Sequence, residues 1–250
     1  MKRKHHRGEN TVFQIDNDNK GVFDSSKFHK KPVDERKTVP PVSPKRKRST
    51  GSEPFEKDAV GLRVIGGKFR GSKLQYIGDN RVRPMKDRTR EAVFNLLGPA
   101  VKGKYVIDLF GGTGALIIEA VSRGAVGGTV IEIHLPTARK LQENLQTLNL
   151  TGVCELKKID AFFWIKQQNH YPSSVADYPL LVFCSPPYDF FVSRKEEMFE
   201  LIIQMYRRVP HGSVFVIESD GRFDIAELPL DLSNVRVRDY PPAKVAILEK

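Results

Sequence analysis

The chain has 250 residues, a formal net charge of +11 and two cysteines. Two cysteines exclude a disulfide framework, and no apolar run reaches the roughly 18 residues that a membrane span needs. No set of His and Cys has the spacing of metal ligands, so we expect no metal, no membrane association and a cytoplasmic location.

The first part of the chain differs from the rest in composition. Residues 1–57 are rich in Lys, Arg, Asp, Asn, Ser and Pro, and their apolar residues follow no helical or strand period. Such a segment cannot bury enough surface to offset the entropy lost on ordering. The composition therefore predicts a disordered basic tail at residues 1–57.

Positive charge is densest in the segment that follows the tail. Residues 61–90 carry nine Lys and Arg against two Asp, whereas residues 91–250 carry 17 basic and 19 acidic residues. An excess confined to one part of a chain indicates a polyanionic partner, most simply nucleic acid. The residues that we expect to contact RNA phosphates are Arg63, Lys68, Arg70 and Lys73.

Local patterns divide the remainder into a small extension at residues 58–98 and a larger domain at residues 99–250. The stretch Leu62–Ile77 reads as two short strands around a Gly-Gly turn. Residues Lys86–Leu97 place their apolar side chains on one helical face. The extension is therefore predicted to be a basic hairpin followed by a helix.

In the larger domain, apolar runs alternate with helical patterns. The runs predict strands at Tyr105–Phe110, Gly128–Ile133, Val153–Ile159, Leu180–Cys184, Val214–Ser219 and Lys244–Lys250. The helical patterns cover Ala115–Gly124, Pro136–Asn149, Ala161–Gln168 and Glu196–Val209. This alternation predicts an α/β fold with a mostly parallel sheet and helices on both faces.

A glycine-rich turn follows the first predicted strand. The strand ends near Asp108, the turn contains Gly111, Gly112 and Gly114, and a helix begins directly after it. Glycines let a ligand approach the backbone, and a helix N-terminus offers unpaired N–H groups. In open α/β sheets ligands bind beyond the carboxyl ends of the strands, so this turn is a candidate binding site.

Two further acidic residues stand at the ends of the next two strands. Glu132 lies 18 residues after Gly114, and Asp160 follows the third strand. A carboxylate in the position of Glu132 can accept hydrogen bonds from both hydroxyls of a ribose. Together with the glycine turn, these residues indicate a cofactor that contains a nucleoside.

These features together resemble the class I S-adenosylmethionine-dependent methyltransferases, whose glycine loop has the form D-x-F-x-G-x-G. The stretches RVIGGKFRGSKL, RPMKDRTREAVFNLL and LFGGTGALIIEAVSRGA, followed by Ser185-Pro186-Pro187-Tyr188, are similar to successive blocks of the RsmD-type small-subunit ribosomal RNA guanine-N2 methyltransferases. The resemblance covers about residues 62–250. It implies a Rossmann-like seven-stranded fold, S-adenosylmethionine as cofactor, and a monomer that acts on small-subunit ribosomal RNA or a ribosomal subunit particle.

The resemblance also implies roles for the residues that match. Gly111, Gly112 and Gly114 would pass the methionine part of the cofactor, with Asp108 beneath them. The block that closes over this end of the cofactor contains Arg83, Asp87 and Arg90.

The same resemblance assigns the adenosine part of the cofactor. Glu132 would hold the ribose, Ile133 would lie against the adenine, and Asp160 would accept a hydrogen bond from the adenine amino group.

The sequence departs from the family pattern in three places. Met85-Lys86 replaces the small hydroxyl residues that usually follow Arg-Pro, and His134 stands where an acid often occurs. Ser185 replaces the usual Asp or Asn, and this departure concerns the chemistry.

The resemblance makes the Ser-Pro-Pro-Tyr tetrad the catalytic segment. A guanine exocyclic amine is a poor nucleophile because its lone pair is delocalised into the ring. The side chain of Ser185 and the carbonyl of Pro186 can accept its two hydrogens and orient the nitrogen, while Pro186 and Pro187 hold the backbone rigid. Tyr188 offers a ring face on which the extruded base stacks.

Two other functions remain open. The tetrad is equally similar to that of DNA cytosine-N4 methyltransferases, although these usually carry a target-recognition region. The second alternative is a basic RNA-binding assembly factor that retains the fold without catalysis. It stays open because the neutral Ser185 replaces the usual Asp or Asn of the tetrad. Methyl transfer to DNA or RNA, and cofactor binding with turnover, separate the three functions.

Overall fold

The computed structural model describes residues 61–78, 84–167 and 179–250. The tail at residues 1–57 and the predicted cofactor residue Arg83 therefore lie outside the described residues. The strands are β1 (Tyr105–Asp108), β2 (Gly127–Ile131), β3 (Cys154–Lys157), β4 (Leu180–Cys184), β5 (Val214–Ser219), β6 (Val235–Tyr240) and β7 (Ala243–Glu249). The α-helices are α1 (Asp87–Leu97), α2 (Ala115–Ser122), α3 (Leu135–Thr147), α4 (Ala161–Trp164), α5 (Phe190–Ser193) and α6 (Lys195–Arg208). Two 3₁₀ turns are η1 (Gly98–Val101) and η3 (Ile225–Glu227).

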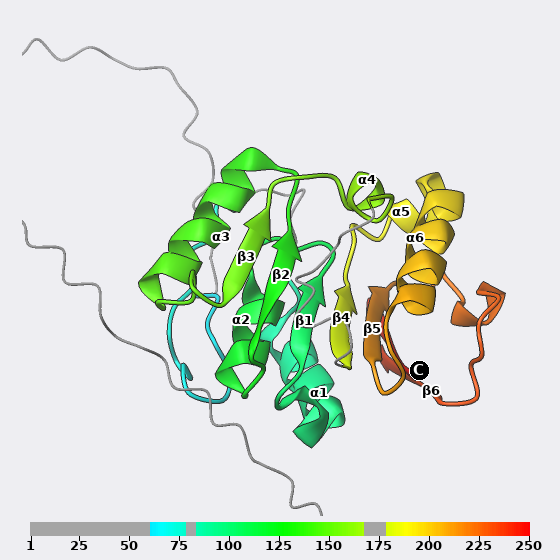
Figure 1. Cartoon of the computed structure of the whole chain (residues 1–250), viewed down its shortest axis with the longest axis horizontal. Coiled ribbons are helices and arrows are strands. Elements are labelled where there is room, and N and C mark those ends of the chain that lie inside the picture. The colour runs from blue at the N-terminus through cyan, green and yellow to red at the C-terminus, as the bar shows by residue number, and fades with distance from the viewer. Residues whose placement is uncertain (1–60, 79–83, 168–178) are drawn as a thin grey trace, which may run out of the picture. The chain divides into compact units, whose positions relative to one another are not determined.

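Within the described ranges, seven strands form one sheet in the order β3-β2-β1-β4-β5-β7-β6 (Figure 1). The first five are parallel, and β7 runs antiparallel to both β5 and β6. Strand order reverses direction between β1 and β4, which is where open α/β sheets bind ligands. The predicted mostly parallel, Rossmann-like sheet is confirmed.

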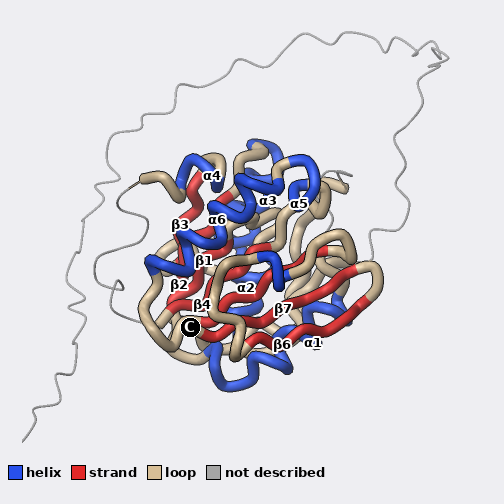
Figure 2. Tube along the Cα trace, turned by 90° about the vertical axis from the view of Figure 1, so that its right-hand side faces the viewer, coloured by secondary structure: helices blue, strands red, loops and turns tan. Residues whose placement is uncertain are grey.

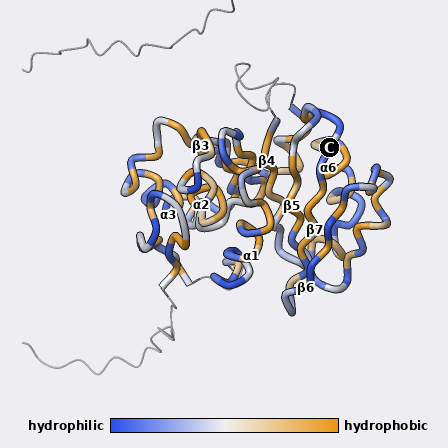
Figure 3. Tube along the Cα trace, turned by 90° about the horizontal axis from the view of Figure 1, so that it is seen from below, coloured by the Kyte–Doolittle hydropathy of each residue, from blue (hydrophilic) through white to orange (hydrophobic). Residues whose placement is uncertain are grey.

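The sheet is covered by helices on both faces, as predicted (Figure 2). Helices α1, α2 and α3 pack on one face and α4, α5 and α6 on the other. Because side chains alternate along a strand, Leu181 and Phe183 of β4 enter the first core, and Leu180 and Val182 enter the second. Every residue of β4 and β5 is buried, and both strands are largely hydrophobic in Figure 3.

The structure corrects three sequence predictions about individual elements. Strand β6 was not predicted, although Val235 and Val237 alternate with exposed arginines in the manner of an edge strand. Helix α4 ends at Trp164 rather than Gln168, and the Arg208 guanidinium donates to the Ile165 carbonyl that a longer helix would use. The two strands expected within Leu62–Ile77 reduce to one bridge, between Arg63 and Lys73, on either side of a turn at residues 66–71.

None of the helices in the described ranges has the length and apolar character that crossing a membrane requires.

A buried carboxylate on α2 anchors the N-terminal hairpin, residues 62–74. Glu119 has no exposed side-chain surface and accepts hydrogen bonds from the backbone N–H groups of Ile65 (2.7 Å) and Gly66 (2.8 Å). It also accepts from Nε of Arg123 at 2.7 Å, and Nε of Arg90 lies 3.9 Å from its other oxygen. Two cations and two amides therefore converge on one carboxylate, which joins the hairpin, α1 and α2.

The end of α2 makes a second contact with the same hairpin. The Ser122 carbonyl accepts from the N–H of Lys68 at 2.7 Å, and the Ser122 hydroxyl accepts from the N–H of Phe69 at 2.9 Å. Gly67 has φ +73°, and a Cβ at this position would lie 1.9 Å from the Ser122 carbonyl oxygen. Only glycine allows so close an approach of the two segments.

We predict that Glu119→Ala lowers the free energy of unfolding by about 3–5 kcal/mol, because the substitution leaves two amides and the Arg123 guanidinium without their acceptor and removes the negative charge next to the buried Arg90. Urea denaturation measures the loss. The control is Glu143→Ala, since the Glu143 side chain is 41% exposed and pairs with Lys140 on the surface. That substitution should cost about 0.5 kcal/mol or less. Similar losses in both variants would contradict the anchoring role of Glu119.

Candidate active site

The predicted site residues gather at the carboxyl edge of the parallel strands. In the register of the sheet, Asp108 of β1 lies beside Phe183 of β4, and Cys184 lies beside Ile217 of β5. The residues that follow each strand therefore stand side by side along one edge. Those after β3, β2 and β1 include the expected cofactor residues, and those after β4 form the tetrad.

Asp108 ends β1 with a side chain that is completely buried. Burial raises its pKa to about 7; the charge of Glu132 adds to this rise, and the nearby N–H groups of Phe110 and Ile117 oppose it. Neither carboxylate oxygen has a hydrogen bond of good geometry among the described residues. A buried carboxylate without a partner is costly, so this one is suited to a cationic ligand group.

The glycine turn brings bare backbone close to this carboxylate. A Cβ on Gly111 would lie 2.2 Å from Cγ2 of Val130, so no larger residue fits there. Gly114 has φ +79° and is the N-cap of α2. The turn thus presents glycine backbone and the start of a helix beside an uncompensated carboxylate, which fits a ligand that carries an amino acid group.

Glu132 faces the same turn from the end of β2. Its carboxylate accepts from the N–H of Gly112 at 2.9 Å and from the N–H of His134 at 2.7 Å. Burial raises the pKa of Glu132, and these two N–H groups partly oppose the rise. The next residue, Ile133, is 59% exposed, so an apolar side chain stands open beside the carboxylate.

Asp160 caps the N-terminus of α4, a role that was not predicted from the sequence. One carboxylate oxygen caps α4 by accepting from the N–H groups of Phe162 (2.7 Å) and Phe163 (3.0 Å). The other oxygen lies 3.9 Å from the guanidinium of Arg194. This second oxygen keeps acceptor capacity for a ligand.

An aromatic cluster next to Asp160 was also missed in the sequence. The rings of Phe110, Phe162 and Phe190 lie 6.0–6.2 Å apart, and the Arg194 guanidinium sits 3.8 Å above Phe162. The cluster joins the segment after β1, helix α4 and the segment after the tetrad. Phe163, between the buried Phe162 and Trp164, has a side chain that is 60% exposed.

The tetrad is bound to a residue that sequence reasoning did not select. The hydroxyl of Ser185 donates to Oε2 of Glu218 at 2.8 Å, and the hydroxyl of Tyr188 donates to Oε1 at 2.7 Å. Glu218 lies near the end of β5 and is 6% exposed. An acidic residue inside an otherwise apolar predicted strand, Val214–Ser219, was the available signal.

The structure shows a structural role for Arg90. Its side chain has no exposed surface, and its nitrogens donate to the carbonyls of Met85 (3.1 Å) and Arg63 (2.6 Å) and to Asp87 (2.9 Å). A guanidinium enclosed in this way fixes the N-terminal extension, and its place in the block that closes over the cofactor stays a prediction. The Asp87 side chain is one-third exposed and forms ion pairs with Arg63 and Arg90.

The residues that depart from the family pattern have local explanations. Met85 is buried in the core, and Lys86 next to it is exposed. His134 is the N-cap residue of α3, and its Nδ1 lies 2.8 Å from the hydroxyl of Thr137. Neither departure alters the carboxylates of Asp108 and Glu132.

The four predicted phosphate-binding residues are exposed: Arg63, Lys68, Arg70 and Lys73. They all lie on the hairpin, residues 62–74, that Glu119 anchors. The aromatic residues of the segment 62–77, Phe69 and Tyr76, are partly buried against the core.

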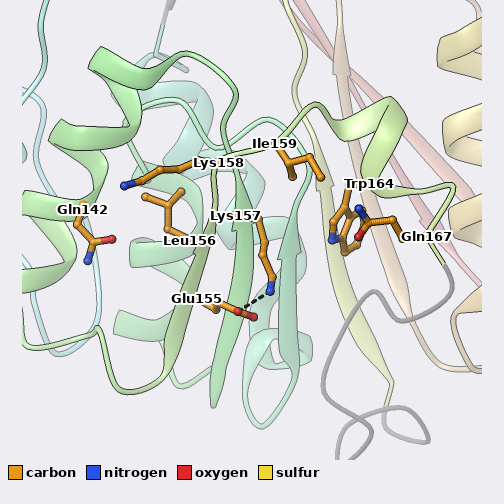
Figure 4. A pocket seen from close by; sticks show the side chains of 8 residues that line it. All are labelled: Gln142, Glu155, Leu156, Lys157, Lys158, Ile159, Trp164 and Gln167. Carbon is orange, nitrogen blue, oxygen red and sulfur yellow. Dashed lines mark hydrogen bonds and ion pairs between the residues drawn. The ribbon is translucent and has the colours of Figure 1, made fainter.

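A cavity of about 520 Å³ lies along the outer strand β3 (Figure 4). Lys157, Lys158 and Gln142 line it, and Lys157 pairs with Glu155. Trp164 borders it but is almost fully buried. No predicted site residue faces this cavity. In the part of the chain that the structure describes, no group of three His, Cys, Asp or Glu could hold a metal ion.

Comparisons with known proteins agree with this arrangement. The model of the family described as "Conserved hypothetical protein 95" matches residues 62–249. The chain is 31% identical over 156 residues to the Haemophilus influenzae protein named ribosomal RNA small subunit methyltransferase D, across 62% of this chain and 77% of that protein. It is 36% identical over 127 residues to the Escherichia coli protein of the same name, across 51% of this chain and 60% of that protein.

A solved structure from Escherichia coli named "Putative methyltransferase yhhF" is 28% identical to the chain. It superposes with a TM-score of 0.60 over 76% of this chain and 98% of that one. The chain therefore belongs to the family described as Conserved hypothetical protein 95, the RsmD-like S-adenosylmethionine-dependent methyltransferases.

Proposed function

We propose that this protein transfers a methyl group from S-adenosylmethionine to the exocyclic N2 of a guanine in small-subunit ribosomal RNA. One observation carries the proposal. Strand β1 ends at Asp108, whose carboxylate has no hydrogen bond of good geometry among the described residues, and the glycine turn follows it. The Ser-Pro-Pro-Tyr tetrad follows β4, which is the neighbouring strand. A cofactor site and an amine-orienting segment thus share one edge of the sheet.

The residues after β1 and β2 fit this cofactor. S-adenosylmethionine carries a sulfonium and an ammonium group, and neither oxygen of the buried Asp108 carboxylate has a hydrogen bond of good geometry among the described residues. Glu132 can accept from ribose hydroxyls, with Ile133 open beside it for the adenine. When bound, the cofactor supplies an electrophilic methyl group and a neutral leaving group.

The tetrad supplies the acceptors for the amine. Ser185 is partly exposed, and its hydroxyl donates its hydrogen to Glu218, so both oxygen lone pairs remain available. The carbonyl of Pro186 is the second acceptor, and the ring of Tyr188 is the stacking surface for the base. Positioning of this kind contributes most of the catalysis when the electrophile comes from the cofactor.

The RNA is proposed to lie along the exposed cations of the hairpin. A substrate of this size needs phosphate contacts outside the site itself, and Lys68, Arg70 and Lys73 offer them on a segment that is fixed to the catalytic domain. We further propose a cytoplasmic monomer that works on RNA or on a ribosomal subunit particle.

The function is tested by incubating the full chain with labelled S-adenosylmethionine and small-subunit RNA, as naked RNA and as assembled particles. We expect N2-methylguanine in the digested RNA, identified by mass spectrometry. Matched duplex DNA serves as the comparison substrate. N4-methylcytosine in DNA would contradict the proposal, as would cofactor binding without methyl transfer to any RNA.

Asp108→Asn tests the proposed cofactor site. The substitution should weaken S-adenosylmethionine binding by about 1–3 kcal/mol in calorimetry, because a charged hydrogen-bond partner is lost. The control is Asp239→Asn, which changes an exposed aspartate and should leave affinity unaltered.

Asp108→Asn should also change the stability of the chain in the absence of the cofactor. The pKa of Asp108 is about 7 in the folded chain against an ordinary value of 3.8, so the folded state binds this proton more tightly than the unfolded state. The stability that this adds is fully present below pH 3.8 and is lost as the pH rises through 7. Asp108→Asn should remove this slope and raise the free energy of unfolding at pH 8 by about 1–3 kcal/mol. Identical pH curves for parent and variant would contradict this account.

The basic hairpin is tested by replacing Lys68, Arg70 and Lys73 together with alanine. RNA affinity should fall, and the slope of log K against log salt should decrease by about 0.7 for each lost phosphate contact. The control removes the same charge from three exposed residues elsewhere: Lys102, Arg236 and Arg238. Equal effects of the two triple variants would show that net charge alone determines binding.

A further inference from the structure

Glu218 is a buried acidic residue on β5 that contacts the tetrad. It is 6% exposed, and its two oxygens accept from Ser185 and Tyr188 at 2.8 and 2.7 Å. Parallel pairing explains the contact, because Cys184 lies beside Ile217 and the next residue of each strand is Ser185 and Glu218. The contact is therefore built into the sheet.

The direction of these hydrogen bonds determines what Ser185 can do. A carboxylate only accepts, so the Ser185 hydroxyl donates its hydrogen to Glu218 and points its lone pairs elsewhere. A hydrogen bond to an ionised acceptor is stronger than a neutral one, and it increases the electron density on the serine oxygen. Glu218 thus turns a freely rotating hydroxyl into an oriented acceptor.

Resting on the proposed function, we propose that Glu218 is a positioning residue which acts through Ser185 and receives the proton that methyl transfer releases. A neutral hydroxyl stands where the family pattern has Asp or Asn. The charge that an aspartate would place at position 185 is supplied from the neighbouring strand, one hydrogen bond further away.

The proton path balances without another reactant. As the guanine N2 forms its bond to the methyl carbon, the carbon–sulfur bond breaks and its electron pair leaves with sulfur. The nitrogen then carries a positive charge and gives a proton to Oγ of Ser185, while the proton of Ser185 passes to Oε2 of Glu218. The carboxylic acid so formed releases its proton to water before the next turnover.

The second hydrogen bond of Glu218 concerns the base. It fixes the hydroxyl of Tyr188, and through it the plane of the ring proposed for stacking. One carboxylate therefore orients both the amine acceptor and the stacking surface. Loss of either contact would let the base move relative to the methyl donor, and small displacements lower such rates strongly.

The environment of Glu218 gives a measurable pH dependence. Burial raises its pKa, and the hydrogen bonds from Tyr188 and Ser185 partly oppose the rise. Among the described residues no charged side chain adds to these causes; on the strand β7, Val245 lies opposite Glu218 and Lys244 opposite Ser219. The relay needs the ionised carboxylate, so the transfer rate should fall on the acid side at a higher pH than an ordinary glutamate gives.

The test measures single-turnover methyl transfer to small-subunit RNA across pH, with the cofactor affinity of each variant determined separately. Glu218→Gln should lower the rate about 10–1,000-fold, abolish the acid limb and leave cofactor affinity within about twofold of the parent. The control is Glu249→Gln, an exposed glutamate on β7 that should retain the parental rate and pH profile.

Two further variants separate this role from a merely structural one. Ser185→Asp should be slower than the parent, because two carboxylates would then face each other at hydrogen-bond distance. The double variant Ser185→Asp with Glu218→Gln should be faster than either single variant, since the charge then stands directly at position 185. This reversal is not expected if Glu218 only supports the fold.

The outcomes distinguish the inference from the proposed function. A parent that binds S-adenosylmethionine and transfers no methyl group to RNA overturns both. An active parent with an unaltered rate and pH profile in Glu218→Gln overturns the inference alone. If Glu218→Gln does not fold, Ser185→Asp decides on its own: a rate above that of the parent overturns the inference, and a lower rate supports it.

Discussion

The parallel register of β4 between β1 and β5 is the constraint on which the site depends. It sets Asp108 beside Phe183 and Cys184 beside Ile217, so the residues that follow three strands meet at one edge. The strands are mostly apolar and buried on both faces, so a shift by one residue would move each side chain into the opposite core and disturb the packing of both. Stability of the core and geometry of the site are therefore the same requirement.

This edge of the sheet holds two buried carboxylates, Asp108 and Glu218, which differ in their hydrogen bonds. Burial raises the pKa of both, but Glu218 already has two hydroxyl donors, whereas Asp108 has no hydrogen-bond partner of good geometry among the described residues. A satisfied carboxylate organises its neighbours, and an unsatisfied one stores free energy that a cationic ligand can recover. The pairing pattern thus separates the proposed positioning of the base from the proposed binding of the cofactor, although both groups are acidic and buried and only β4 lies between their strands.

Local sequence patterns were sufficient for six of the seven strands of the sheet in the described residues. Apolar runs located β4 and β5 to the residue, and the glycine turn marked Asp108, because these signals act over a few neighbouring positions. Glu218 escaped notice since its partner Ser185 is 33 residues away, and only the strand order brings them together. The structural role of Arg90 could not be predicted for a related reason: a sequence shows that an arginine is present but not that its surroundings enclose it.

The serine at position 185 is best understood together with its neighbour on β5. An aspartate there would place a second carboxylate against Glu218, and two such groups in a buried site cannot both stay ionised without cost. Serine avoids this repulsion, donates to the existing carboxylate and still presents two acceptor lone pairs. The departure from the family pattern is therefore consistent with an active site, because the missing charge lies within one hydrogen bond of the residue that lacks it.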